Sequence, residues 1–197
     1  MSNVPRKPMT PEEFLAWEER REPRYKFDGR QPVATTGGTI EHALIGGRLR
    51  TPLHDGPCKV FGPTMKIEAA SHIRYPDAFV TCTPLQPKSS AVQEPVVVFE
   101  VLSPGTPRTD RIEKPRECRA TQSVQRNIIL EQDSIGATFF TRSDDVWTVQ
   151  AQMAGDALDM SEIGVSLALT DIYADVDVPA TLATTAQPDH QPQGRRT

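Results

Sequence analysis

The segment Pro95-Val96-Val97-Val98-Phe99-Glu100-Val101-Leu102 is an almost continuous apolar run, rich in β-branched residues, that carries one carboxylate, Glu100. Such a run predicts a central strand that is covered on both faces. An ionised carboxylate inside a buried strand is costly unless it has a positive partner, a shifted pKa or a metal ion. This segment therefore predicts both a sheet-centred fold and a functional site.

The segment Arg74-Tyr75-Pro76-Asp77-Ala78-Phe79-Val80 predicts a neighbouring strand, with Asp77 near its start. Two carboxylates on adjacent central strands can converge, and their mutual repulsion then favours a divalent cation between them, and the oxygen ligands favour Mg²⁺. The alternative is that Glu100 forms a buried salt bridge with an arginine and that Asp77 ends a turn. The residue types alone leave both interpretations open.

The other expected elements surround these two strands. Thr10-Pro11-Glu12-Glu13 has the pattern of a capped helix start, with Thr10 as the N-cap and Glu13 closing a capping box. Asp28-Gly29 predicts the turn of a β-hairpin. We also expect a helix over 39–54, a strand over 59–68, a helix over 110–122, strands over 128–131, 137–142 and 147–150, and a closing segment over 158–173. This mixture indicates the α/β class.

The chain has 197 residues, which suits one domain. We expect that domain over 10–178, with a flexible arm over 1–9 and a disordered, polar tail over 179–197. No apolar run approaches the ~18 residues of a membrane span, and the start does not resemble a signal peptide, so we expect no membrane association and a cytoplasmic location.

The net charge is −4 and the sequence pI about 5.6. An acidic chain lacks the clustered positive charge that normally supplies non-specific affinity for nucleic acid. It does not exclude a nuclease, because the carboxylates of a metal site are themselves acidic. Neither a P-loop, a Rossmann fingerprint nor a serine-hydrolase elbow is present.

The cysteines are Cys58, Cys82 and Cys118, an odd number without a C-x-x-C pair. This spacing predicts neither a disulfide framework nor a structural zinc site. We expect Cys58 and Cys82 to act as small core residues. His42 is expected on a helix near the site, as a polar residue of the helix surface.

The strings RYPDAFV (74–80), PVVVFEVLSP (95–104) and TDRIEK (109–114) resemble the Uma2 family of restriction-endonuclease-like proteins. The resemblance extends from about residue 9 to 178. The family belongs to the PD-(D/E)XK nuclease superfamily, so the resemblance implies a restriction-endonuclease-like α/β fold, a mixed central sheet flanked by helices. It also implies Mg²⁺-dependent hydrolysis of DNA phosphodiester bonds. Mn²⁺ is the alternative metal, RNA the alternative substrate, and a homodimer the expected assembly.

Carried over residue by residue, Asp77 matches the Asp of the PD motif and Glu100 the acidic residue of the next strand, so both would hold the metal. The lysine position of the Glu-x-Lys motif is Leu102 here. The resemblance therefore assigns the supporting catalytic charge to Lys114 in the following helix, with Lys66 on the preceding strand as the alternative.

This sequence also departs from the family pattern. Lys26 and Thr64 stand where family members usually carry Glu and Asp, and Cys118 stands at an expected tyrosine. Pro115 follows Lys114 directly and would interrupt its helix at a cost of about 3 kcal/mol if it were interior. These departures support a second hypothesis, a catalytically decayed member that serves as a binding or structural protein.

Overall fold

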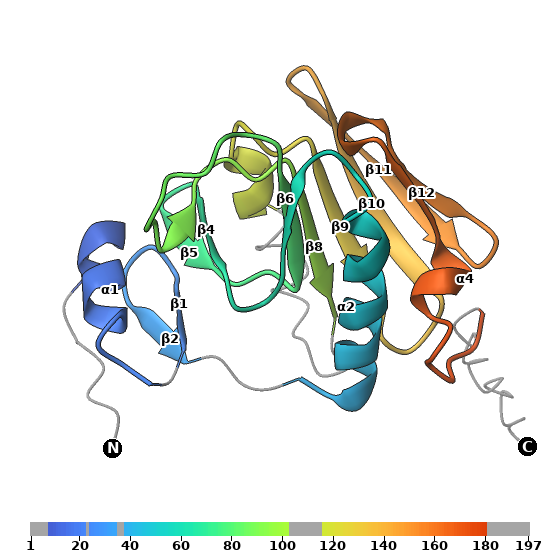
Figure 1. The fold of residues 1–197 in the computed structure, drawn as a ribbon, viewed down its shortest axis with the longest axis horizontal. Helices are drawn as coiled ribbons and strands as arrows, with labels where there is room; N and C mark the ends of the chain where they lie inside the picture. Colours follow the sequence, from blue (N-terminus) through green and yellow to red (C-terminus); the bar gives the residue numbers. More distant parts are fainter. Residues whose placement is uncertain (1–7, 23, 35–37, 103–115, 181–197) are drawn as a thin grey trace, which may run out of the picture.

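The computed structural model describes residues 8–22, 24–34, 38–102 and 116–180. Its centre is a six-stranded mixed sheet in the order β11-β10-β9-β8-β6-β3 (Figure 1). Its strands are β3 (Lys59–Phe61), β6 (Ala78–Thr81), β8 (Val97–Val101), β9 (Arg126–Leu130), β10 (Gly136–Ser143) and β11 (Val146–Met153). Strands β8 and β9 are parallel, and every other neighbouring pair is antiparallel. The α/β class with a mixed central sheet is confirmed.

The expected central strand is confirmed, because all five residues of β8 are buried. Val97, Phe99 and Val101 belong to the core cluster that also contains residues of the helix α2 (Ile40–Leu53). Val98, which alternates with them, packs on the opposite face with Phe79. The Val/Phe run is therefore apolar on both sides because both of its faces are covered.

Helix α2 lies along one face of this sheet (Figure 1). Its buried residues Ile45, Leu49 and Leu53 recur every four positions and form one apolar stripe. The Thr39 hydroxyl caps its start by accepting a hydrogen bond from the His42 amide. The helix contains two adjacent glycines and a proline, and tertiary burial of the stripe outweighs their unfavourable helix propensity.

A second, five-stranded sheet has the order β2-β1-β5-β4-β7. Its strands are β1 (Tyr25–Phe27), β2 (Pro32–Ala34), β4 (Lys66–Ala69), β5 (His72–Arg74) and β7 (Ala91–Val92). Helix α1 (Pro11–Glu18) packs against it through Phe14, which joins Phe27 and Ile73 in a buried cluster. The predicted capping box is present in α1, and the predicted hairpin joins β1 and β2.

The strand expected over 59–68 is divided between the two sheets. Residues 59–61 belong to the six-stranded sheet, and residues 66–69 belong to the five-stranded one. Gly62 and Pro63 lie at the point where the chain leaves one sheet for the other, since proline cannot donate to a strand ladder. A second crossing returns the chain from β5 to β6, immediately before Ala78.

The end of the described chain forms a hairpin of β12 (Ala157–Met160) and β13 (Val165–Ala168). Between them lies the short 3₁₀ helix η1 (Ser161–Ile163), and after them the helix α4 (Leu169–Ile172). Leu158, Leu167 and Ile172 join the core on the α2 side of the sheet. On the opposite side, a helical segment over 116–120 buries Cys118 against Val98.

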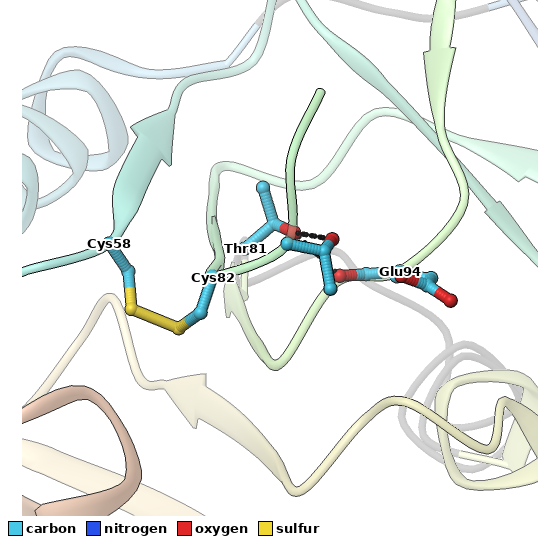
Figure 2. Close-up of a disulfide and its surroundings, with 5 residues drawn as sticks. Cys58, Thr81, Cys82 and Glu94 are labelled. Atoms are coloured by element: carbon cyan, nitrogen blue, oxygen red, sulfur yellow. Dashed lines mark hydrogen bonds between the residues drawn. A yellow bond between two sulfur atoms is a disulfide. The ribbon is translucent and has the colours of Figure 1, made fainter. Parts of the chain in front are cut away.

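The prediction that Cys58 and Cys82 form no disulfide is wrong. They are bonded, with a Cα–Cα distance of 4.5 Å (Figure 2). The register of β3 against β6 pairs Lys59 with Thr81, and this places the two cysteines opposite each other one step further along. The two cysteines are 24 residues apart in the sequence, and the alignment of β3 with β6 brings them together. Cys118 is a free, buried cysteine.

Some predictions fall outside the described residues: most of the arm over 1–9, the tail from 181 onward, Lys114, Pro115 and the start of the helix expected over 110–122. Of that helix, residues 116–120 are described and are helical. In the described ranges, no helix combines the length and the apolar character needed to cross a membrane.

Candidate functional site

Asp77 and Glu100 lie at the same end of two adjacent strands. Asp77 directly precedes β6, and Glu100 is the fourth residue of β8. The antiparallel register pairs Ala78 with Phe99, so one further step brings Asp77 alongside Glu100. The register therefore places the two acidic residues that the sequence singled out at neighbouring backbone positions of adjacent strands.

The Asp77 carboxylate is held through one of its two oxygens. Its Oδ2 accepts a hydrogen bond of 2.7 Å from the Val101 amide, and His42 Nε2 lies 3.3 Å from the same oxygen. Within the described residues, Oδ1 has no hydrogen-bond partner. The side chain is 14% exposed. Asp77 thus does more than end a turn, because its Oδ2 joins β8 to α2.

His42 lies in the first turn of α2, where the Thr39 cap holds the backbone. The sequence indicated only a polar residue on the helix surface. The structure places its ring beside the candidate site, with 22% of the side chain exposed. A histidine on one element and an aspartate on another, far apart in the chain, carry no spacing pattern that sequence analysis could recognise.

Glu100 is 9% exposed. It alternates with Phe99 and shares the face of Val98, so it lies on the side of the sheet opposite α2. Its negative charge helps to raise the pKa of Arg74. A buried carboxylate on this face requires positive charge nearby, and the second candidate interpretation from the sequence anticipated an arginine in that role.

Arg74 makes its direct hydrogen bonds to another carboxylate. Its Nε and one terminal nitrogen each donate to Glu117 at 2.6 Å, and His72 Nε2 lies 3.4 Å from Glu117 as well. Burial by itself would lower the pKa of Arg74, but the hydrogen bonds and charge of Glu117, followed by the charges of Glu100 and Asp28, raise it. Arg74 therefore pairs with Glu117 and lends Glu100 a positive surrounding.

Lys66, the alternative supporting lysine, belongs to a buried network. Its Nζ lies 2.6 Å from Glu18 on α1, and the Glu18 side chain is only 4% exposed. Glu18 also accepts hydrogen bonds from the Tyr25 amide and the Tyr75 hydroxyl. Burial and the Glu18 carboxylate raise the pKa of Tyr75. Lys66 therefore neutralises the charge of the buried Glu18 carboxylate.

Thr64, which replaces the family's usual Asp, lies exposed in the turn between β3 and β4. No group of three or more His, Cys, Asp or Glu side chains that could hold a metal occurs within the described ranges. Two carboxylates suit Mg²⁺ nonetheless, because this ion keeps several waters and binds proteins through one or two carboxylates. The available Oδ1 of Asp77 fits such an oxygen-donor site.

Comparisons with known proteins identify the family. The family model described as "Uma2: Putative restriction endonuclease" matches residues 11–170. A protein of Synechocystis sp. described as "Uncharacterized protein slr1290" is 33% identical over 173 residues, covering 84% of this chain and 91% of that protein.

A solved structure from Anabaena variabilis, described as "a putative nuclease belonging to DUF820", has the same fold. Its TM-score is 0.69 at 16% identity, over 85% of this chain and 98% of that chain. The family match extends from α1 to α4 and includes both acidic residues of the candidate site. The chain belongs to the Uma2 family of restriction-endonuclease-like proteins.

Proposed function

We propose that this protein is a Mg²⁺-dependent endonuclease that hydrolyses DNA phosphodiester bonds in the cytoplasm, with Asp77 and Glu100 as metal ligands. The observation that carries the proposal is the Asp77 carboxylate, anchored through Oδ2 to the backbone of β8 beside Glu100. Membership of the Uma2 family and the shared fold support it.

The proposed roles follow from the position of each residue. A bound divalent cation supplies polarisation of the scissile phosphate and a lower pKa for the attacking water. Asp77 would bind the metal through Oδ1, because the Val101 amide occupies its other oxygen. Glu100, in β8, contributes a second negative charge at the same end of the sheet, and Asp77 directly precedes the adjacent strand β6. Lys114 is the proposed cation that stabilises charge on the transition state.

A plasmid-nicking assay tests the catalytic assignment. Purified protein with Mg²⁺ should convert supercoiled DNA to the open circle, whereas Asp77→Asn and Glu100→Gln should each lower the rate on the order of 100-fold or more. Asp159→Asn, an exposed acidic residue of β12, is the matched control and should cleave like the wild type. Equal rates for all variants would remove the assignment. Parallel reactions with Mn²⁺ and with RNA distinguish the alternative metal and substrate.

The second candidate function is that of a catalytically inactive binding or structural protein. It is favoured by Thr64, because the family's acidic residue is absent from the turn that leads into β4. Calorimetric titration with Mg²⁺ and Mn²⁺ separates the two. Metal binding that Glu100→Gln abolishes supports a working site, while absence of binding, together with absence of cleavage, supports the inactive alternative.

A further inference from the structure

Strand β11 forms one edge of the six-stranded sheet. It pairs with β10 along its whole length, from Ser143↔Val146 to Gly136↔Met153. Within the described part of the chain, no strand pairs with its other side. The strand therefore presents a row of backbone donors and acceptors to solvent.

This edge lacks the usual protection against pairing. Its sequence, Val-Trp-Thr-Val-Gln-Ala-Gln-Met over residues 146–153, has no charged residue, glycine or proline. Val146 is 65% exposed, Val149 57% and Met153 54%. Natural edge strands are normally short, charged or bulged. The opposite edge of the same sheet, β3, follows that rule, since it has three residues and begins with Lys59.

The ladder itself shows which residues point their backbone groups outward. In an antiparallel strand, the backbone N–H and C=O groups of successive residues point alternately toward the strand on one side and toward the other side. The Arg142 amide donates to Gln125 on the β9 side, so Arg142 and its partner Trp147 turn their backbone groups away from each other. By alternation, Val149 and Ala151 also present theirs to the open side.

The free stretch ends at Met153. Its amide donates to the Asp156 side chain, and its carbonyl accepts from the Asp156 amide. The available backbone groups thus belong to Trp147, Val149 and Ala151, with Val149 at their centre. Their side chains share one face of the sheet with Phe140, which lies opposite Val149 in β10.

We propose that a second copy of this chain pairs with β11, antiparallel, about a two-fold axis through Val149. In this register Trp147 lies opposite Ala151 of the second copy, so a large side chain meets a small one, and the two Val149 residues meet at the axis. On the other face, Thr148 lies opposite Gln150, which allows hydrogen bonds between polar side chains. No like charges meet between the two β11 strands. The available backbone N–H and C=O groups of Trp147, Val149 and Ala151 in each copy pair with those of the other copy.

Self-pairing accounts for the neutrality of the strand better than a charged partner would. An edge that selects a different protein generally uses charge complementarity to fix the partner and the register. This strand has no charged residue. Its bulky Trp147 and its small Ala151 lie two residues to either side of Val149, so each meets the other across the two-fold axis. The proposed dimer does not depend on the nuclease site, which lies on β6 and β8.

Molar mass from light scattering during size exclusion, measured over a range of protein concentrations, tests the proposal. The full-length wild type should be a dimer. Val149→Lys and Val149→Glu should each be monomeric, because identical charges would meet at the axis. An equimolar mixture of the two should recover a dimer, because opposite charges then meet. Ile40→Lys, the same change at a residue of α2 that is 75% exposed, should remain dimeric.

Circular dichroism of each variant establishes that it is folded. A wild type that is monomeric at every concentration overturns the proposal, and so does either single variant that stays dimeric. A mixture that stays monomeric overturns the register about Val149. None of these outcomes bears on cleavage, so the nuclease proposal and the dimer can fail separately.

Discussion

The Asp77 side chain is held in place by contacts to one of its two oxygens. Both of its contacts, to the Val101 amide and to His42, involve Oδ2. A carboxylate held in this way loses little rotational freedom when its other oxygen binds a cation. In the proposed metal site, His42 would be a positioning residue that acts on the metal through Asp77.

Replacing His42 tests this role. His42→Ala should weaken Mn²⁺ or Mg²⁺ binding about 10-fold, because groups that orient a metal ligand typically contribute a factor of that size. Calorimetric titration measures the affinity, and urea unfolding shows whether stability changes. Ile40→Ala, in the same turn of α2, is the control. Metal affinity unchanged by His42→Ala would contradict the positioning role.

A comparison of Lys66 with Lys114 separates a structural lysine from a catalytic one. Lys66→Met should destabilise the protein by about 3 kcal/mol in urea unfolding, because it leaves the buried Glu18 carboxylate without its cation. Adding Glu18→Gln should recover part of that loss. Lys114→Met should lower nicking while leaving stability nearly unchanged. Loss of cleavage by Lys66→Met without loss of stability would assign the catalytic charge to Lys66 instead.

At the scale of elements, the chain crosses twice between its two sheets within the segment that the disulfide encloses. Cys58 and Cys82 join the start of β3 to the end of β6, and β4, β5 and Asp77 lie between them. The buried Thr81 hydroxyl donates to the Glu94 carbonyl at the same strand end (Figure 2). This end of β6 is therefore tied to both of its flanking segments.

The disulfide should contribute measurably to stability. By loop-closure entropy, the cross-link should stabilise the fold by about 3 kcal/mol. The Cys58→Ser/Cys82→Ser variant should lose that amount in urea unfolding, and a reducing agent should destabilise the wild type but not the variant. Mass spectrometry of the alkylated protein reports the bond directly. If reduction leaves the unfolding midpoint unchanged, the cross-link has no stabilising role.

At the scale of the whole molecule, one edge of the central sheet is short and begins with a lysine, and the other is long and neutral. Pairing of two β11 strands would extend the sheet across both copies and remove its exposed edge. The two candidate sites of such a dimer would lie on β6 and β8 of each copy, away from the two-fold axis.

Stability should then depend on protein concentration. The thermal midpoint of the wild type should rise as the concentration is increased, because association stabilises the folded state by mass action. The midpoint of Val149→Lys should be independent of concentration. Differential scanning calorimetry at several concentrations measures both. A wild-type midpoint that does not move would argue against a dimer linked to folding.

Local patterns were sufficient for much of the architecture. The Thr10–Glu13 capping box, the Asp28-Gly29 hairpin and the buried strand around Glu100 were predictable, since each depends on neighbours a few residues apart or on alternation along one strand. The sequence also singled out Asp77 and Glu100 as a pair, because carboxylates within apolar strands are conspicuous.

The tertiary structure decided which distant side chains meet. Cys58 and Cys82 are 24 residues apart, and Arg74 and Glu117 are 43 apart, and no local pattern links either pair. The division of residues 59–69 between two sheets decided that Lys66 faces Glu18. The physical reason is that strand register and sheet crossing determine these contacts, and both depend on the packing of the whole chain rather than on any one segment.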